Sequence, residues 1–167
     1  KSHLRISSST EDTYLTSLIT ETRQEIEDTT GIALITQTWK LTLDRWPHAR
    51  ERWWDGMIEA HQNIIYEGSR WADVQLPRYP LQSITSVTVY DEASNSTAVT
   101  VADVFVTDTA FLRGRLTLKS GASWPVALRD NAAIEIVYVS GFGDAGTDVP
   151  SPIKRAIRQM AAFMYEH

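Results

Sequence analysis

Residues that could share one buried helix face recur at helical spacing near the start of the chain. Ser8 and Glu11 have the spacing of a capping box, and Gly31 suits a left-handed residue that closes a helix. The recurring positions between them are Leu15, Leu18, Ile19, Thr22 and Ile26. This pattern predicts a helix over residues 8–30.

A second helical pattern occupies residues 151–167. Ser151 suits the N-cap and Pro152 the first helical position, where its missing N–H is not needed. The apolar stripe that follows consists of Ile153, Ala156, Ile157, Met160, Ala161 and Met164. We therefore expect an amphipathic helix with one buried face.

Residues 33–140, between the two helices, are predicted to be rich in strands. Alternation is clearest over residues 35–43, and residues 83–90 are rich in β-branched side chains. The polar stretch "DEASNST" suits a hairpin loop, Arg113-Gly114 and Ser120-Gly121 suit turns, and "AAIEIVYVS" reads as the last strand. Residues 47–73 depart from this pattern and are interpreted as an excursion from the sheet, in which residues 57–66 could be helix or strand.

The predicted order is a helix, five or six strands and a helix, without the alternation that builds a parallel sheet. This order indicates the α+β class, with terminal helices flanking an antiparallel sheet in a single domain over residues 1–167. A content of 43% hydrophobic and 22% charged residues is typical of globular domains. No apolar run reaches the roughly 20 residues of a membrane span, so no membrane contact is expected.

A literal G-x-G-x-x-G stands between the last strand and the last helix, at Gly141, Gly143 and Gly146. In a dinucleotide-binding loop the glycines lead directly into a helix that holds the pyrophosphate. Here Asp148-Val149-Pro150 intervenes, and Pro150 disfavours a helical residue before it. We interpret the motif as a connection and expect no bound cofactor.

Catalytic and metal-binding patterns are weak. The chain has no cysteine, and no serine lies in a G-x-S-x-G elbow. The four histidines lack the spacing of metal ligands; they are His3, His48, His61 and His167. We therefore expect no metal site and no enzymatic activity.

Two groups of residues suggest contacts with partners. A Trp-rich group could form a core, a subunit interface or a sugar-stacking platform, and it consists of Trp46, Trp53, Trp54 and Trp71. Lys154, Arg155 and Arg158 could be a solvated face, or a basic patch for an acidic partner or nucleic acid. The net charge of −5 argues against a dedicated DNA-binding module.

Several segments in order resemble the head–tail connector (adaptor) family of tailed phages and gene transfer agents. They include "EDTYLTSLITETRQEIEDTTG", "ALITQTWKLTLDRWP", "LPRYPLQSITSVTVYDE", "GASWP" and "DVPSPIKRAIRQMAAFMYE". The resemblance runs over essentially the whole chain and is most specific over residues 31–43, 76–90 and 140–166. The excursion at 47–73 departs from it.

The resemblance implies a structural virion protein without catalysis. Such adaptors form a ring, typically dodecameric, beneath the portal, where they extend the DNA channel and present a platform for the stopper or tail. Double-stranded DNA would pass through the ring without sequence-specific binding. The implied location is the virion neck, assembled in the host cytoplasm.

Carried onto this sequence, the resemblance makes residues 8–30 and 151–167 the ring-building helices. The portal side is then expected at Lys154, Arg155, Arg158, Met160, Phe163, Met164, Tyr165, Glu166 and His167. The Trp group would form a subunit or tail-side interface. The alternative is a carbohydrate- or ligand-binding β-module that uses these Trp residues.

Overall fold

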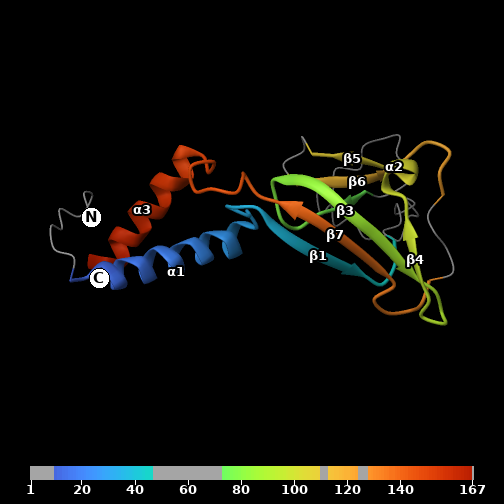
Figure 1. Cartoon of the computed structure of the whole chain (residues 1–167), viewed down its shortest axis with the longest axis horizontal. Coiled ribbons are helices and arrows are strands. Elements are labelled where there is room, and N and C mark those ends of the chain that lie inside the picture. Colours follow the sequence, from blue (N-terminus) through green and yellow to red (C-terminus); the bar gives the residue numbers. More distant parts are fainter. Residues whose placement is uncertain (1–9, 47–72, 110–112, 124–127, 167) are drawn as a thin grey trace, which may run out of the picture.

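The computed structural model describes residues 10–46, 73–109, 113–123 and 128–166. These form a pair of helices and a β-rich body that lie end to end along the long axis of the molecule (Figure 1). Helix α1 spans Asp12–Thr30 and helix α3 spans Ser151–Glu166. The α+β class predicted from the sequence is confirmed.

The β-rich body contains two antiparallel sheets. The four-stranded sheet has, in spatial order, β1 (Gln37–Leu43), β7 (Ile134–Ser140), β3 (Leu81–Tyr90) and β4 (Ser96–Val99). The three-stranded sheet has, in spatial order, β2 (Val74–Gln75), β6 (Arg115–Leu118) and β5 (Phe105–Asp108). A short helix, α2 (Val101–Val104), joins β4 to β5 and was not expected from the sequence.

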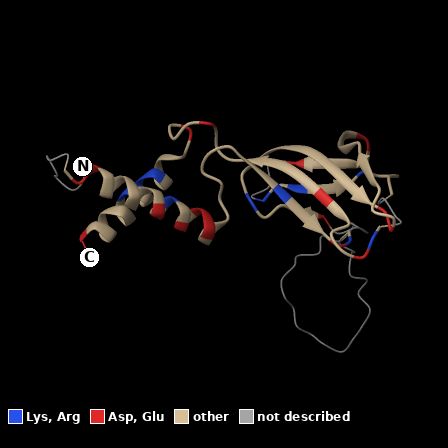
Figure 2. Cartoon of the chain, turned by 60° about the horizontal axis from the view of Figure 1, so that its bottom comes forward, with Lys and Arg blue, Asp and Glu red and all other residues tan. Residues whose placement is uncertain are grey.

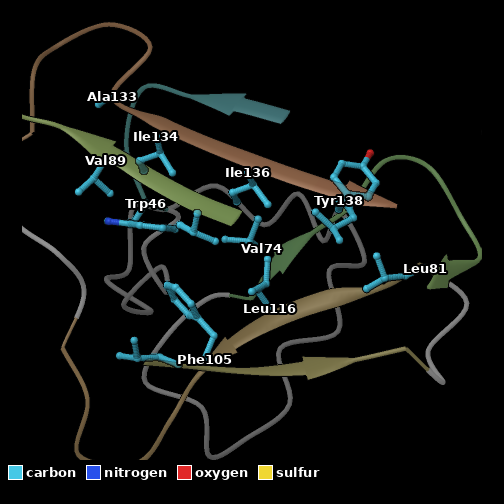
Figure 3. Packing of buried hydrophobic residues seen from close by; sticks show 13 residues of the cluster. Trp46, Val74, Leu81, Val89, Phe105, Leu116, Ala133, Ile134, Ile136 and Tyr138 are labelled. Atoms are coloured by element: carbon cyan, nitrogen blue, oxygen red, sulfur yellow. The ribbon is translucent and has the colours of Figure 1, made fainter. Parts of the chain in front are cut away.

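One hydrophobic cluster joins the two sheets (Figure 3). Strand β7 alternates strictly, so that Ile134, Ile136 and Tyr138 are buried while the residues between them are half-buried. Phe105 and Leu116 enter the same cluster from the three-stranded sheet. Strand β7 therefore has the period-two pattern that its sequence shows, and its buried face is turned toward the second sheet.

Strand β1 obeys the predicted alternation. Leu41 lies opposite Ile136 and Leu43 opposite Ile134 in the antiparallel register with β7, and both leucines pack on the core. On the other face, Lys40 pairs with Glu135 of β7 at 3.2 Å. The strand therefore has one apolar and one solvated face, as its sequence predicts.

The helix boundaries differ from the predicted ones by a few residues. Helix α1 begins at Asp12 rather than Ser8, and its N-cap Glu11 makes no side-chain capping bond; Ser8 lies outside the described residues. At the other end, Gly31 has φ 77° and donates its N–H to the Glu27 carbonyl, which confirms the predicted cap. Helix α3 begins at Ser151, one residue before the expected first position.

The two terminal helices pack on each other beyond the end of the sheets, rather than on a sheet face (Figure 1). A second, smaller cluster supports this arrangement at the end nearest the β body. It is built from Leu34, Val149 and Ile157, with Ile26, Ile32 and Ile153 packed against it. In the part of the chain that is described, neither helix has the length and apolar character needed to cross a membrane.

Candidate functional site

The glycine-rich connection is shaped by a close approach of two backbone segments. Gly141 has φ 142°, and a Cβ there would lie 2.4 Å from the Ile35 carbonyl oxygen. The Thr36 N–H donates to the Gly143 carbonyl at 2.9 Å, which ties this connection to the segment before β1. Gly146 has open space around its Cβ position. The close approach of the two backbone segments therefore requires a glycine at position 141.

An exposed carboxylate, that of Asp148, lies against this loop. The Asp148 side chain accepts the Ala145 N–H at 3.0 Å, and a Cβ on Gly143 would meet the same carboxylate at 2.3 Å. The helix begins after Pro150, whose carbonyl accepts the N–H groups of Ile153 and Lys154. This geometry suits a strand-to-helix connection, and it places negative charge where a dinucleotide loop would hold phosphate.

Antiparallel contacts between α1 and α3 form a helical hairpin, the name used below for these two helices (Figure 1). At its far end the rings of Tyr14 and Tyr165 lie 6.1 Å apart, and the Tyr165 hydroxyl donates to the Glu11 carboxylate. That hydrogen bond raises the pKa of Tyr165. The Thr22 hydroxyl donates to the Leu18 carbonyl at 2.7 Å and lies 3.5 Å from the Met164 sulfur. Met164 and Tyr165 therefore face α1.

The residues predicted for the portal side divide along α3. The cations lie in its first half, where Lys154 donates to the Thr147 carbonyl at 3.1 Å and Arg155 is exposed. Phe163 lies in the last two turns with 62% exposure. Met160 and the Met164–Tyr165 pair are half-buried, Glu166 is exposed, and His167 lies outside the described residues.

Arg78 joins the helical hairpin to the β body. Its guanidinium donates to the Glu27 carbonyl at 2.6 Å and to the Asp28 carboxylate at 3.1 Å. The same group lies 4.5 Å from the ring centroid of Trp39 on β1. The last turn of α1 has no basic residue of its own, so Arg78 supplies the positive charge that a helix C-terminus favours.

Glu27 and Tyr79 strengthen this junction. One Glu27 carboxylate oxygen accepts the Leu34 N–H at 2.8 Å and the Gln37 side-chain amide at 3.1 Å. The Tyr79 hydroxyl donates to the Thr30 carbonyl at 2.9 Å. The chain between α1 and β1 is therefore held on both sides, which fixes how the hairpin projects from the β body.

Sequence reasoning missed the junction. The signal that could have indicated it is the position of Arg78 in "PRYP", where two prolines stiffen the chain around a single cation. Its partners Glu27 and Asp28 are about 50 residues away in sequence, so periodicity could not connect them.

Replacing Arg78 by Met should lower the free energy of unfolding by about 2 kcal/mol, because a charge-assisted bond to a backbone carbonyl is lost. The Asp28 carboxylate is largely exposed, so its ion pair should contribute little. Urea denaturation followed by circular dichroism measures the change. Arg155→Met, at an exposed cation without a described carboxylate partner, is the matched control, and equal stability of the two variants would contradict this role for Arg78.

The Trp group is only partly described. Trp46 is 4% exposed and lies in the core with its ring 5.6 Å from that of Phe105. Trp53, Trp54 and Trp71 lie outside the described residues, so their predicted place in an interface stays a prediction. Trp46 takes part in the packing of the β body.

Two hollows lie on the described surface, and most of the residues that line them are of polar types. One of about 590 Å³ lies over the outer side of α1, from Asp12 to Glu21, and one of about 540 Å³ is lined by Glu92 and residues 129–132. No Trp is among the described residues that line either hollow. Over the same described ranges, no three acidic, His or Cys side chains converge as metal ligands would.

Comparisons with known proteins identify a matching family and solved structures with a similar fold. A family model described as "Phage gp6-like head-tail connector protein" matches residues 1–98. A chain from the "virion of native gene transfer agent (GTA) particle" is 25% identical, with a TM-score of 0.70 over 99% of this chain and 74% of that chain. A chain from the neck of an empty GTA particle, with C6 symmetry, is 26% identical with the same TM-score and coverage.

A third similar chain comes from the "neck of native GTA particle computed with C12 symmetry". It is 25% identical, with a TM-score of 0.65 over 92% of this chain and 70% of that chain. Comparison with curated proteins gave no match. The similarity to the neck chains includes both the helical hairpin and the β body, since it covers nearly all of this chain.

Proposed function

The chain belongs to the phage gp6-like head–tail connector family, and we propose that it is a structural subunit of a virion neck that acts by assembling into a ring. The observation that carries this proposal is the whole-chain similarity to subunits of particle necks solved with C6 and C12 symmetry. Twelve copies are therefore the proposed number. Its role is geometric and needs no catalytic group.

The ring would sit between the portal and the stopper or tail and would extend the channel through which double-stranded DNA passes. The overall charge of −5 per chain suits a wall past which DNA slides, because acidic surfaces repel the phosphate backbone. The DNA would meet no sequence-reading element. The location that follows is the neck of a phage or gene transfer agent, with assembly in the host cytoplasm.

The far end of the helical hairpin is proposed as the portal side. Phe163 offers exposed aromatic surface there, and Tyr14 is 51% exposed beside Tyr165. Exposed aromatic side chains are enriched at protein interfaces. The Trp residues of the excursion are proposed for a subunit or tail-side surface. The shape of the molecule suits this division, because its two parts lie at opposite ends (Figure 1).

The test is the mass of the assembled species, measured by light scattering or sedimentation on the chain alone and mixed with the portal protein of the same particle. We expect a species near twelve times the 18.8 kDa of one chain, alone or as a stoichiometric complex with the portal. A chain that stays monomeric in both mixtures would contradict the proposal. Phe163→Asp should weaken portal binding.

A further inference from the structure

Three acidic side chains form a stripe on one side of α1. Glu21, Glu25 and Asp28 are spaced four and three residues apart, and all three are exposed. Since a helix turns by about 100° per residue, this spacing keeps them on one flank over about 10 Å of helix. We call these three residues the acidic flank.

Three cations cluster on α3. Lys154 and Arg158 are one helical turn apart, and Arg155 lies next to Lys154 and farther from the buried face. Arg155 and Arg158 are exposed, and the Arg158 guanidinium donates to the Lys154 carbonyl of its own helix at 3.2 Å. We call Lys154, Arg155 and Arg158 the basic flank.

The two flanks lie on opposite sides of the helical hairpin. Leu18 and Ile157 are buried and mark the faces by which α1 and α3 meet. In an antiparallel pair, helical geometry then turns the acidic flank to one side and the basic flank to the other. Figure 2 agrees, with the Lys and Arg of the hairpin along one side and most of its Asp and Glu along the other.

Among the described residues, neither flank has much compensating charge. Cations in the first turns of α3 and acids near the end of α1 both oppose the helix dipole. Glu21 with Glu25, and Lys154 with Arg158, are like charges at a spacing that destabilises a helix. Among the ion pairs of the described residues, only Asp28 of these six side chains takes part, with Arg78.

We propose that the basic flank of one subunit contacts the acidic flank of the next subunit around the ring. The inference rests on the proposed ring and identifies the surfaces that close it. A cyclic ring joins its copies head to tail, so two different surfaces of the same chain must be complementary. The flanks meet this requirement, because they have opposite charge and lie on opposite sides of the helical hairpin.

Apolar side chains accompany both flanks. Ile19 is 46% exposed, and the helix periodicity places it on the side of the basic flank. The same periodicity places Phe163 on the side of the acidic flank. Each side therefore combines charge with apolar surface, as protein interfaces do. The family resemblance implied the portal side for the basic flank. The inference gives it a second copy of the chain as its partner instead.

The test uses two charge-reversed variants, Glu21→Lys/Glu25→Lys and Arg155→Glu/Arg158→Glu. The first has two basic sides and the second two acidic sides, so neither can join to itself. Each alone should form at least about tenfold less ring than the wild type, because like charges would face each other at every contact. An equimolar mixture should restore rings in which the two variants alternate, within about twofold of the wild-type yield. Native mass spectrometry, with the portal added where the wild type requires it, counts each variant per ring.

The control is Glu92→Lys/Asp130→Lys, which reverses two exposed charges on the β body and should assemble like the wild type. Restoration by mixing excludes misfolding as the reason why either variant fails alone. Rings from either variant alone, or a mixture that stays unassembled, would overturn the inference. The inference would also be overturned if the Arg155→Glu/Arg158→Glu variant formed normal rings that no longer bind the portal. The basic flank would then belong to the portal side. A wild type that never assembles would instead contradict the proposed function.

Discussion

Gly141→Ala is expected to lower the free energy of unfolding by about 4 kcal/mol, near the upper end of single-residue effects. The backbone at Gly141 has φ 142°, a conformation that costs an L-residue about 1–3 kcal/mol. The added Cβ would also lie 2.4 Å from the Ile35 carbonyl oxygen and 2.5 Å from its carbon. Both contacts are with backbone, so they cannot be relieved by a rotamer change.

Gly146→Ala is the matched control for this variant. It belongs to the same loop, and its Cβ position has no neighbour within 4 Å. We expect its stability to stay within about 0.5 kcal/mol of the wild type. Chemical denaturation of both variants measures the two free energies of unfolding. A Gly141→Ala variant as stable as Gly146→Ala would show that the loop can be displaced at little cost in stability.

Trp46→Ala should destabilise the fold by about 3–5 kcal/mol, as large-to-small changes of buried aromatic residues do. Trp46 packs against Phe105 between the two sheets, and little of its surface reaches solvent (Figure 3). The cavity left behind would be bounded by strands of both sheets, which limits its collapse. Thermal unfolding followed by near-ultraviolet circular dichroism measures the loss.

Phe163→Ala is the comparison for Trp46→Ala, because it removes an aromatic ring that is 62% exposed. Its cost should stay below about 1 kcal/mol. A Trp46→Ala chain that unfolds at the wild-type temperature would contradict the core role and would favour the interface role that the sequence also allowed.

Periodicity predicted the elements well where one face is buried. The alternation of Trp39, Leu41 and Leu43 reappears as the core face of β1, and Gly31 closes α1 as expected. The family resemblance, which was based on several segments in order, is confirmed by the family match over residues 1–98. Helix α2 is a single turn of four residues, too short to leave a periodic pattern.

The placement of the helices could not be predicted from the sequence. An amphipathic helix can bury its apolar stripe against a sheet or against another helix, and the stripe is the same in both cases. The choice depends on contacts such as Arg78 with Glu27, which join residues about 50 positions apart. The sequence shows that one face of a helix is charged. The side of the hairpin on which this charge lies can be known only from the antiparallel pairing of the two helices.

The closure of the hairpin also sets an order of events during synthesis. The Glu11–Tyr165 bond joins residues 154 positions apart, so α1 has to wait for α3 to leave the ribosome before it finds its partner. Contacts of such long sequence separation slow folding, because the entropy of closing a long loop is lost before they form. A nascent chain that already carries its β body therefore still lacks a paired hairpin until α3 has been made.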